Sequence, residues 1–169
     1  MFHKKGIDFE EVDLGAIKSI LHTIGLIYGC KEITELYSFN FYKLNGIIYG
    51  FNGKVPDIIK QKVGLSEIPK PSQLGIPLLM VTERKVVPML PLGQYMVKAC
   101  HNVIHLPEAL ASKVLYGKTV IIKDSYSFWR GLLRDKRGDF LAFLKLRKLG
   151  NETEIIPELD IGWYLREGG

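Results

Sequence analysis

The segment TVIIKDSYSFWRGLLRDKRGDFLAFLKLRK, residues 119–148, carries the clearest signal for the fold of this chain. Its apolar run at residues 119–123 predicts a buried strand with a cationic end. Residues 132–134 and 140–146 predict two further strands, which the turn-forming residues 136–138 join as a hairpin. The segment therefore indicates several short strands close together in sequence.

The flanking residues extend this pattern. Upstream, residues 95–99 and 103–106 predict short strands, and residues 107–116 predict a short helix that Gly117 ends. Downstream, residues 160–166 predict a helical turn whose first residue, an aspartate, caps the free amides. Short strands around one small helix indicate a compact barrel in the second half of the chain.

The first half has a different pattern. Apolar residues recur at helical spacing over residues 8–28, which predicts an amphipathic helix with Asp8 as its cap and Gly29 at its end. Residues 37–42 and 47–51 predict two antiparallel strands, because the Asn-Gly pair between them is the strongest short-range hairpin signal. A helix followed by an antiparallel hairpin is therefore expected here.

Further along, residues 56–62 predict a short helix that begins at a proline. Residues 78–82 predict a strand, and a turn at residues 83–85 leads into a second apolar run. We therefore expect an α+β protein, with an N-terminal α/β domain with an antiparallel sheet at residues 1–93 and a second, barrel-like domain at residues 94–169.

Positive charge is concentrated in the second half. The whole chain has a formal net charge of +5, and residues 113–148 hold ten Lys and Arg residues against three Asp residues. Residues 149–169 hold five acidic residues against one Arg. A dense positive block can follow a phosphate backbone, because each neutralised phosphate releases condensed counterions. It can equally be a solvated face, so charge alone leaves both interpretations open.

The cysteine pattern and the apolar runs indicate the cellular compartment in which the protein is expected. Cys30 and Cys100 are far apart and form no Cys-x-x-Cys pair, so we expect thiols without a disulfide or a cysteine metal site. This usage fits a reducing interior, and no signal peptide or apolar run of about 18 residues is present. We therefore expect a cytoplasmic protein that does not enter a membrane.

Catalytic signatures are missing from the sequence. His101 and His105 share one face of an expected strand, but no third metal ligand accompanies them. There is no phosphate-binding Gly-rich loop, no serine elbow and no His-Glu-x-x-His helix. We therefore expect a protein that is not an enzyme and that holds no metal and no cofactor.

Five short motifs appear in a fixed order along the chain. They are YSFNF (37–41), NGIIY (45–49), SQLG (72–75), LYGKTV (115–120) and DIGWYLR (160–166). In this order and spacing they resemble the Nip-seven family of large-subunit ribosome biogenesis factors, and the compact chain resembles archaeal members most. The resemblance implies an N-terminal α/β domain followed by a PUA domain, and a role in ribosomal RNA maturation with other assembly proteins. RNA is the partner that it implies. We expect the chain to be a monomer.

The chain departs from that family just ahead of the last motif. Archaeal relatives tend to have basic residues there, where this chain has Asn151-Glu152-Thr153-Glu154. That RNA contact cannot be carried over, so we expect the contacts on the basic face upstream. The predicted RNA-binding residues are Lys118, Lys123, Arg134, Arg137, Arg147 and Lys148.

Aromatic residues are interleaved with this basic block. We expect Phe128 to be buried and either Tyr126 or Trp129 to be exposed for stacking on unpaired bases, whereas Trp163 is expected to pack. Two alternatives stay open. One is a protein adaptor in ribosome assembly, and the other is an accessory domain of an RNA-modifying enzyme.

Overall fold

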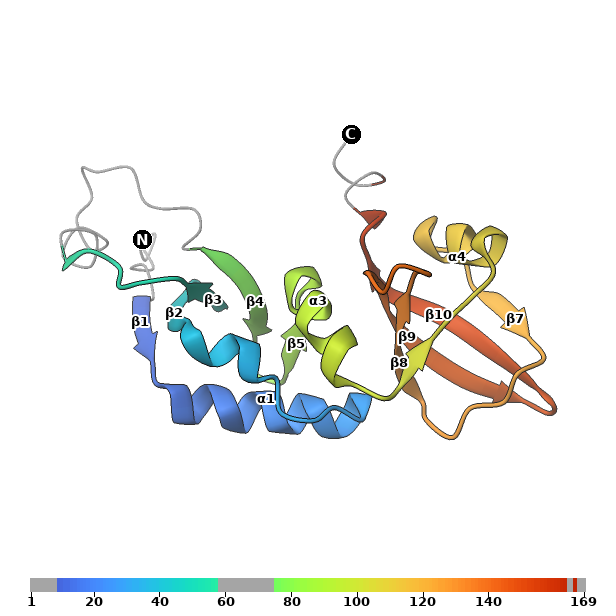
Figure 1. Cartoon of the computed structure of the whole chain (residues 1–169), viewed down its shortest axis with the longest axis horizontal. Helices are drawn as coiled ribbons and strands as arrows, with labels where there is room; N and C mark the ends of the chain where they lie inside the picture. The colour runs from blue at the N-terminus through green and yellow to red at the C-terminus, as the bar shows by residue number, and fades with distance from the viewer. Residues whose placement is uncertain (1–8, 58–74, 164–165, 167–169) are drawn as a thin grey trace, which may run out of the picture.

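The computed structural model describes residues 9–57, 75–163 and 166, which form two five-stranded sheets with helices between and around them (Figure 1). The strand order of the first sheet is β1-β2-β3-β4-β5, and every pairing in it is antiparallel. The order of the second is β6-β8-β9-β10-β7, with a parallel pairing only between β6 and β8. The predicted α+β class with an antiparallel N-terminal sheet is confirmed.

The first sheet and its helices occupy the left of Figure 1. The elements are β1 (Phe9–Val12), α1 (Leu14–Tyr28), the short 3-10 helix η1 (Thr34–Ser38), β2 (Asn40–Leu44), β3 (Ile47–Phe51), β4 (Ile76–Val81) and β5 (Val86–Pro88). The predicted hairpin is present, since Asn45 and Gly46 both have positive φ, 49° and 80°, as a type I′ turn requires. The short helix predicted over 56–62 and most of the SQLG motif lie outside the described residues.

The start of the first helix was predicted wrongly. The helix begins at Leu14, and the carboxylate of Asp13 caps it by accepting a 3.0 Å hydrogen bond from the Ala16 N–H. Residues 9–12 instead pair with β2 as an edge strand, a contact that helical spacing in the sequence cannot reveal. The predicted end is correct, because Gly29 is left-handed, with a φ of 63°.

The second half continues from a helix into the second sheet. Its elements are α3 (Leu90–Ala99), β6 (Val103–Ile104), α4 (Glu108–Leu115), β7 (Val120–Ile122), β8 (Arg130–Arg134), β9 (Phe140–Leu149) and β10 (Glu152–Asp160). The predicted small helix, the strand after it and the hairpin are confirmed. The strand predicted over 95–99 is wrong, because Leu92, Met96 and Val97 are buried at helical spacing on α3. Strand β10 was not predicted.

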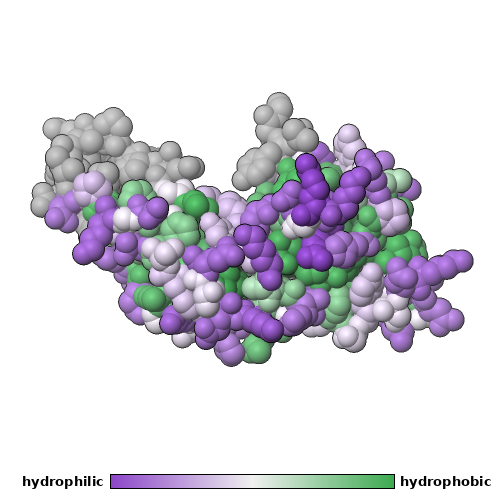
Figure 2. All heavy atoms as spheres, viewed as in Figure 1, coloured by the Kyte–Doolittle hydropathy of each residue, from purple (hydrophilic) through white to green (hydrophobic). Residues whose placement is uncertain are grey.

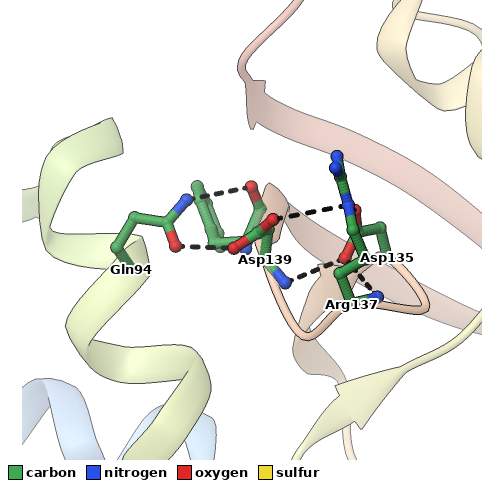
Figure 3. Close-up of polar contacts among 5 residues, drawn as sticks. Gln94, Asp135, Arg137 and Asp139 are labelled. Carbon is green, nitrogen blue, oxygen red and sulfur yellow. Dashed lines mark hydrogen bonds and ion pairs between the residues drawn. The ribbon is translucent and has the colours of Figure 1, made fainter.

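One hydrophobic core joins the two halves. Phe140 and Phe143 of β9 lie in the same cluster as Leu92 and Met96 of α3. A Cβ at Gly93 would overlap the Phe140 ring, so this position in α3 needs a glycine. The side-chain amide of Gln94 also donates to the Phe140 carbonyl at 3.4 Å and accepts from its N–H at 3.3 Å (Figure 3). The domain boundary predicted between residues 93 and 94 thus falls inside a helix that packs on both halves.

Cys30 and Cys100 form a disulfide, which contradicts the expectation of two free thiols. They lie at the ends of α1 and α3, where an antiparallel bridge and a 3.0 Å bond from the Lys31 N–H to the Ala99 carbonyl hold the chains together. The pairing spans 70 residues of sequence, so only helix packing reveals it. Disulfides are typical of oxidising compartments, so cysteine usage no longer favours a reducing one. None of the described helices is long and apolar enough to cross a membrane.

Candidate nucleic-acid interface

Helix α4 borders two adjoining hollows on the second half. One, of about 470 Å³, separates α4 from the loop between β8 and β9, and the other, of about 350 Å³, separates the end of α4 from residues 161–166. Both include Ser112 and Leu115, so we treat them as one α4 groove. The buried Val114 anchors the helix to the inner face of the second sheet. Figure 2 shows hydrophilic and hydrophobic patches side by side on the visible face of this half.

The β8–β9 loop forms one end of the α4 groove and is ordered by Asp135. The Asp135 carboxylate accepts hydrogen bonds from the backbone N–H groups of Arg137 at 2.8 Å and Asp139 at 2.9 Å, and from Nε of Arg137 at 3.3 Å (Figure 3). The backbone N–H of Asp139, followed by the groups of Arg137, lowers the pKa of Asp135 below its ordinary value. The loop thereby presents Lys136 and Arg137 at the surface.

The other end of the groove is shaped by an ion pair in the terminal segment. The two carboxylate oxygens of the buried Asp160 accept from the Arg166 guanidinium at 3.0 and 2.9 Å. Arg166 also donates to the Leu115 carbonyl, and a Cβ at Gly162 would clash with the same carbonyl. Asp160 thus holds an arginine side chain, whereas the sequence predicted that it would cap backbone amides. The ion pair ties the terminal turn to the end of α4.

This turn leaves an aromatic surface exposed. Tyr116 is 71% exposed, Trp163 is 44% exposed and Ile161 is 42% exposed. The expectation that Trp163 is a packing residue is therefore wrong in part. Tyr116 was not among the predicted RNA-binding residues, although the LYGKTV motif places it between the helix and the following glycine. Exposed rings beside lysines are the components of a surface for unpaired bases.

The structure divides the six predicted RNA-binding residues into two groups. Arg134 and Arg137 line the α4 groove, and the exposed Lys118 follows Gly117 at its other end. Lys123, Arg147 and Lys148 lie instead at the far ends of β7 and β9.

Arg134 is also hydrogen-bonded to a histidine. Its Nε donates to Nε2 of His105 at 2.9 Å, so this imidazole nitrogen serves as an acceptor. Within the described ranges, no group of three or more His, Cys, Asp or Glu side chains is placed to hold a metal.

Arg147 lies on the outer face of the second sheet, the side away from α4. We define this outer face by Lys145, Arg147, Glu154 and Ile156, which are cross-strand neighbours on β9 and β10. Nε of Arg147 is 2.6 Å from the Glu154 carboxylate, whose side chain is only 15% exposed. The acidic segment at residues 151–154, which replaces the basic residues of archaeal relatives, thus lies directly across from a predicted RNA-binding residue.

Lys148 lies on the opposite face of the sheet from Arg147. Successive strand residues alternate between faces, and Lys148 borders a hollow with Tyr126, Phe128 and Trp129 rather than the outer face. Trp129 is exposed, while Tyr126 and Phe128 are partly buried, so the expectation of one exposed aromatic residue here is met by Trp129. Arg147 and Lys148 therefore cannot form one contact surface on a flat strand.

Comparisons with known proteins add a fold assignment. No family model and no curated protein matches this chain. Among solved structures, it is similar to a conserved PUA domain protein from Thermoplasma acidophilum, with a TM-score of 0.53 and 12% sequence identity. The match covers 89% of this chain and 93% of that one, so it includes both sheets. The chain therefore has an α+β fold similar to that of a PUA domain protein.

Proposed function

We propose that this protein binds RNA without catalysing a reaction, and that the α4 groove is its main contact. The observation that carries the proposal is the exposed Tyr116 and Trp163 rings, with Lys118 at the same end of the groove and Lys136 and Arg137 at the other. Cations at both ends match a phosphate backbone, and the rings at the Lys118 end match unpaired bases.

The family resemblance supports a narrower role. The two most specific motifs of the Nip-seven resemblance, residues 115–120 and 160–166, meet at the α4 groove through Leu115 and Arg166. A PUA-like fold with these motifs in contact supports a part in large-subunit ribosome biogenesis, with ribosomal RNA and other assembly proteins as partners. The proposal includes a monomeric protein, and its place in the cytoplasm rests on the resemblance alone, because the disulfide does not favour a reducing compartment.

The polar groups of the groove support a binding role over a catalytic one. Asp160 is held by Arg166, Asp135 holds loop amides, and His105 accepts a bond from Arg134. Each of these side chains already has a partner within the protein. A general acid or base must lie within hydrogen-bond reach of a substrate proton, and these side chains are instead turned toward groups of the protein.

The test is a binding titration with a labelled RNA stem-loop at several salt concentrations. Changing Lys118→Glu together with Lys136→Glu should weaken binding about 100-fold at low salt, because two phosphate contacts become repulsive. The slope of log K against log salt should fall by roughly 1.4 to 1.8.

The matched control is Lys31→Glu with Lys54→Glu, which changes the net charge equally on exposed residues of the first half. We expect less than about a threefold loss from this control, the part due to net charge alone. Equal losses from the two double variants would show that binding follows total charge and not the α4 groove.

A further inference from the structure

A second hollow lies where the two halves of the molecule meet. This interdomain cleft has a volume of about 410 Å³, within the range of about 300–1,000 Å³ typical of ligand pockets. Its walls come from α1, β5, β8, β9 and β10, and its lining shares no residue with the α4 groove. Its apolar lining residues are Ile24, Ile27, Val86, Val87, Pro88, Phe143 and Leu159. The cleft has room for a flat ring system.

Polar groups stand at one wall of this cleft. Arg130 forms an ion pair with Glu158, and its guanidinium carbon lies 4.9 Å from the centre of the Trp129 ring. Tyr28 also lines this wall, and burial raises the pKa of its hydroxyl, so the hydroxyl keeps its proton. Nε of Arg130 is buried and has no partner in the described part of the chain. The wall thus combines donors and acceptors with an apolar surface.

Trp129 is the exposed aromatic residue at this site. It is 57% exposed and borders both the interdomain cleft and the hollow beside Lys148. Lys85 lines the cleft on the side of the first sheet. Among the described residues, neither Lys85 nor Lys148 has an ion-pair partner. An exposed indole therefore lies between hollows that each carry an unpaired lysine.

We infer that Trp129 and the interdomain cleft form a second RNA contact, which takes one unpaired base of a single-stranded segment. The base stacks on the indole at the mouth of the cleft, and the phosphates on either side contact Lys85 and Lys148. Two unpaired cations flanking an aromatic ring favour a polyanion with ring systems over a protein segment. A base within a duplex has both faces covered, so this contact selects unpaired RNA.

The inference rests on the proposed RNA binding. Because the chain has two tryptophans, one at each contact, fluorescence can test the second contact separately from the proposed function. The Trp129 signal is the fluorescence of the wild-type protein minus that of Trp129→Phe, which leaves Trp163 and the α4 groove unchanged. A single-stranded RNA should quench this fluorescence, whereas a blunt duplex of equal length should not.

Affinity measured with labelled RNA gives a second readout. Trp129→Leu should weaken single-strand binding about tenfold and leave duplex binding within about twofold, because one stacked base is lost. Trp129→Phe keeps an aromatic face and is the matched control, with a loss of no more than about threefold. Lys85→Glu, an exposed substitution that leaves the core intact, should also weaken single-strand binding selectively.

The outcomes are distinguishable. Unchanged Trp129 fluorescence, with single-strand binding still lost in Lys118→Glu/Lys136→Glu, overturns the second contact and leaves the proposed function standing. Equal losses for single strand and duplex in Trp129→Leu also overturn it. No binding of any RNA by the wild-type protein at low salt overturns both proposals.

Discussion

The α4 groove and the outer face of the second sheet draw their cations from one basic block of the sequence, yet they differ in what opposes those cations. At the groove, Arg137 is paired with Asp135 and Asp139, but Lys118 and Lys136 are exposed and have no ion-pair partner in the described ranges. On the outer face, Arg147 is bound by Glu154 across the strand pair. Charge density along a chain thus differs from charge available to a ligand, because strand pairing brings acids from another segment beside the bases.

Among the substitutions that compare these two surfaces, the largest expected effect comes from breaking the groove itself. Gly162→Ala places a methyl group against the Leu115 carbonyl and should displace the terminal turn from α4. We expect the free energy of unfolding to fall by about 1–3 kcal/mol. RNA affinity should fall about tenfold, which corresponds to about 1.4 kcal/mol. Thermal melting and RNA titration measure the two effects.

Gly150→Ala is the matched control for this substitution at the turn between β9 and β10. Gly150 has a φ of 60° and open space around an added Cβ, so alanine there costs backbone strain of about 1 kcal/mol without a clash. RNA affinity should not change. An equal affinity loss in both variants would mean that the groove has no special part in binding.

A smaller effect is expected from the loop at the other end of the groove. Asp135→Asn removes the carboxylate that orders Lys136 and Arg137, and should weaken RNA binding about threefold. Because the folded-state pKa of Asp135 is lowered, its stabilising contribution is complete above the ordinary carboxyl pKa and is lost as the pH falls through the lowered value. Wild-type loop order should therefore not change between about pH 5 and pH 8. The measurement is hydrogen exchange of the Asp139 amide. If its exchange rate rose between these pH values by more than the intrinsic pH dependence of exchange, the prediction would be contradicted.

The smallest effect is expected on the outer face of the second sheet. Glu154→Gln releases Arg147 from its ion pair and should strengthen RNA binding two- to threefold, with a salt slope steeper by about 0.7 to 0.9. Stability should change by no more than about 1 kcal/mol, because the arginine side chain is largely exposed. Adding Arg147→Gln should remove the gain. An unchanged affinity in Glu154→Gln would show that the outer face lies away from RNA whatever its charge.

The correct helix and strand predictions depend on neighbouring residues, whereas the wrong one depends on a contact with a residue far away in the sequence. The Asn45-Gly46 hairpin and the end of α1 at Gly29 were correct because a positive φ is a local requirement that the residue itself meets. The strand predicted over 95–99 failed because the segment is in α3, whose buried face packs under Phe140 of a distant strand. The helical spacing of Leu92, Met96 and Val97 appears only over the whole of α3, and residues 95–99 taken alone do not show it.

The sequence by itself determined the α+β class, the hairpins, helix α4 and the concentration of positive charge, because these follow from neighbouring residues and backbone preferences. Only the tertiary structure decided which cations remain unpaired, where Tyr116 and Trp129 are exposed, and that Cys30 and Cys100 join. The physical reason is that ion pairs, stacking surfaces and disulfides depend on distances between residues far apart in the chain. Those distances are set by the shared core between the two sheets.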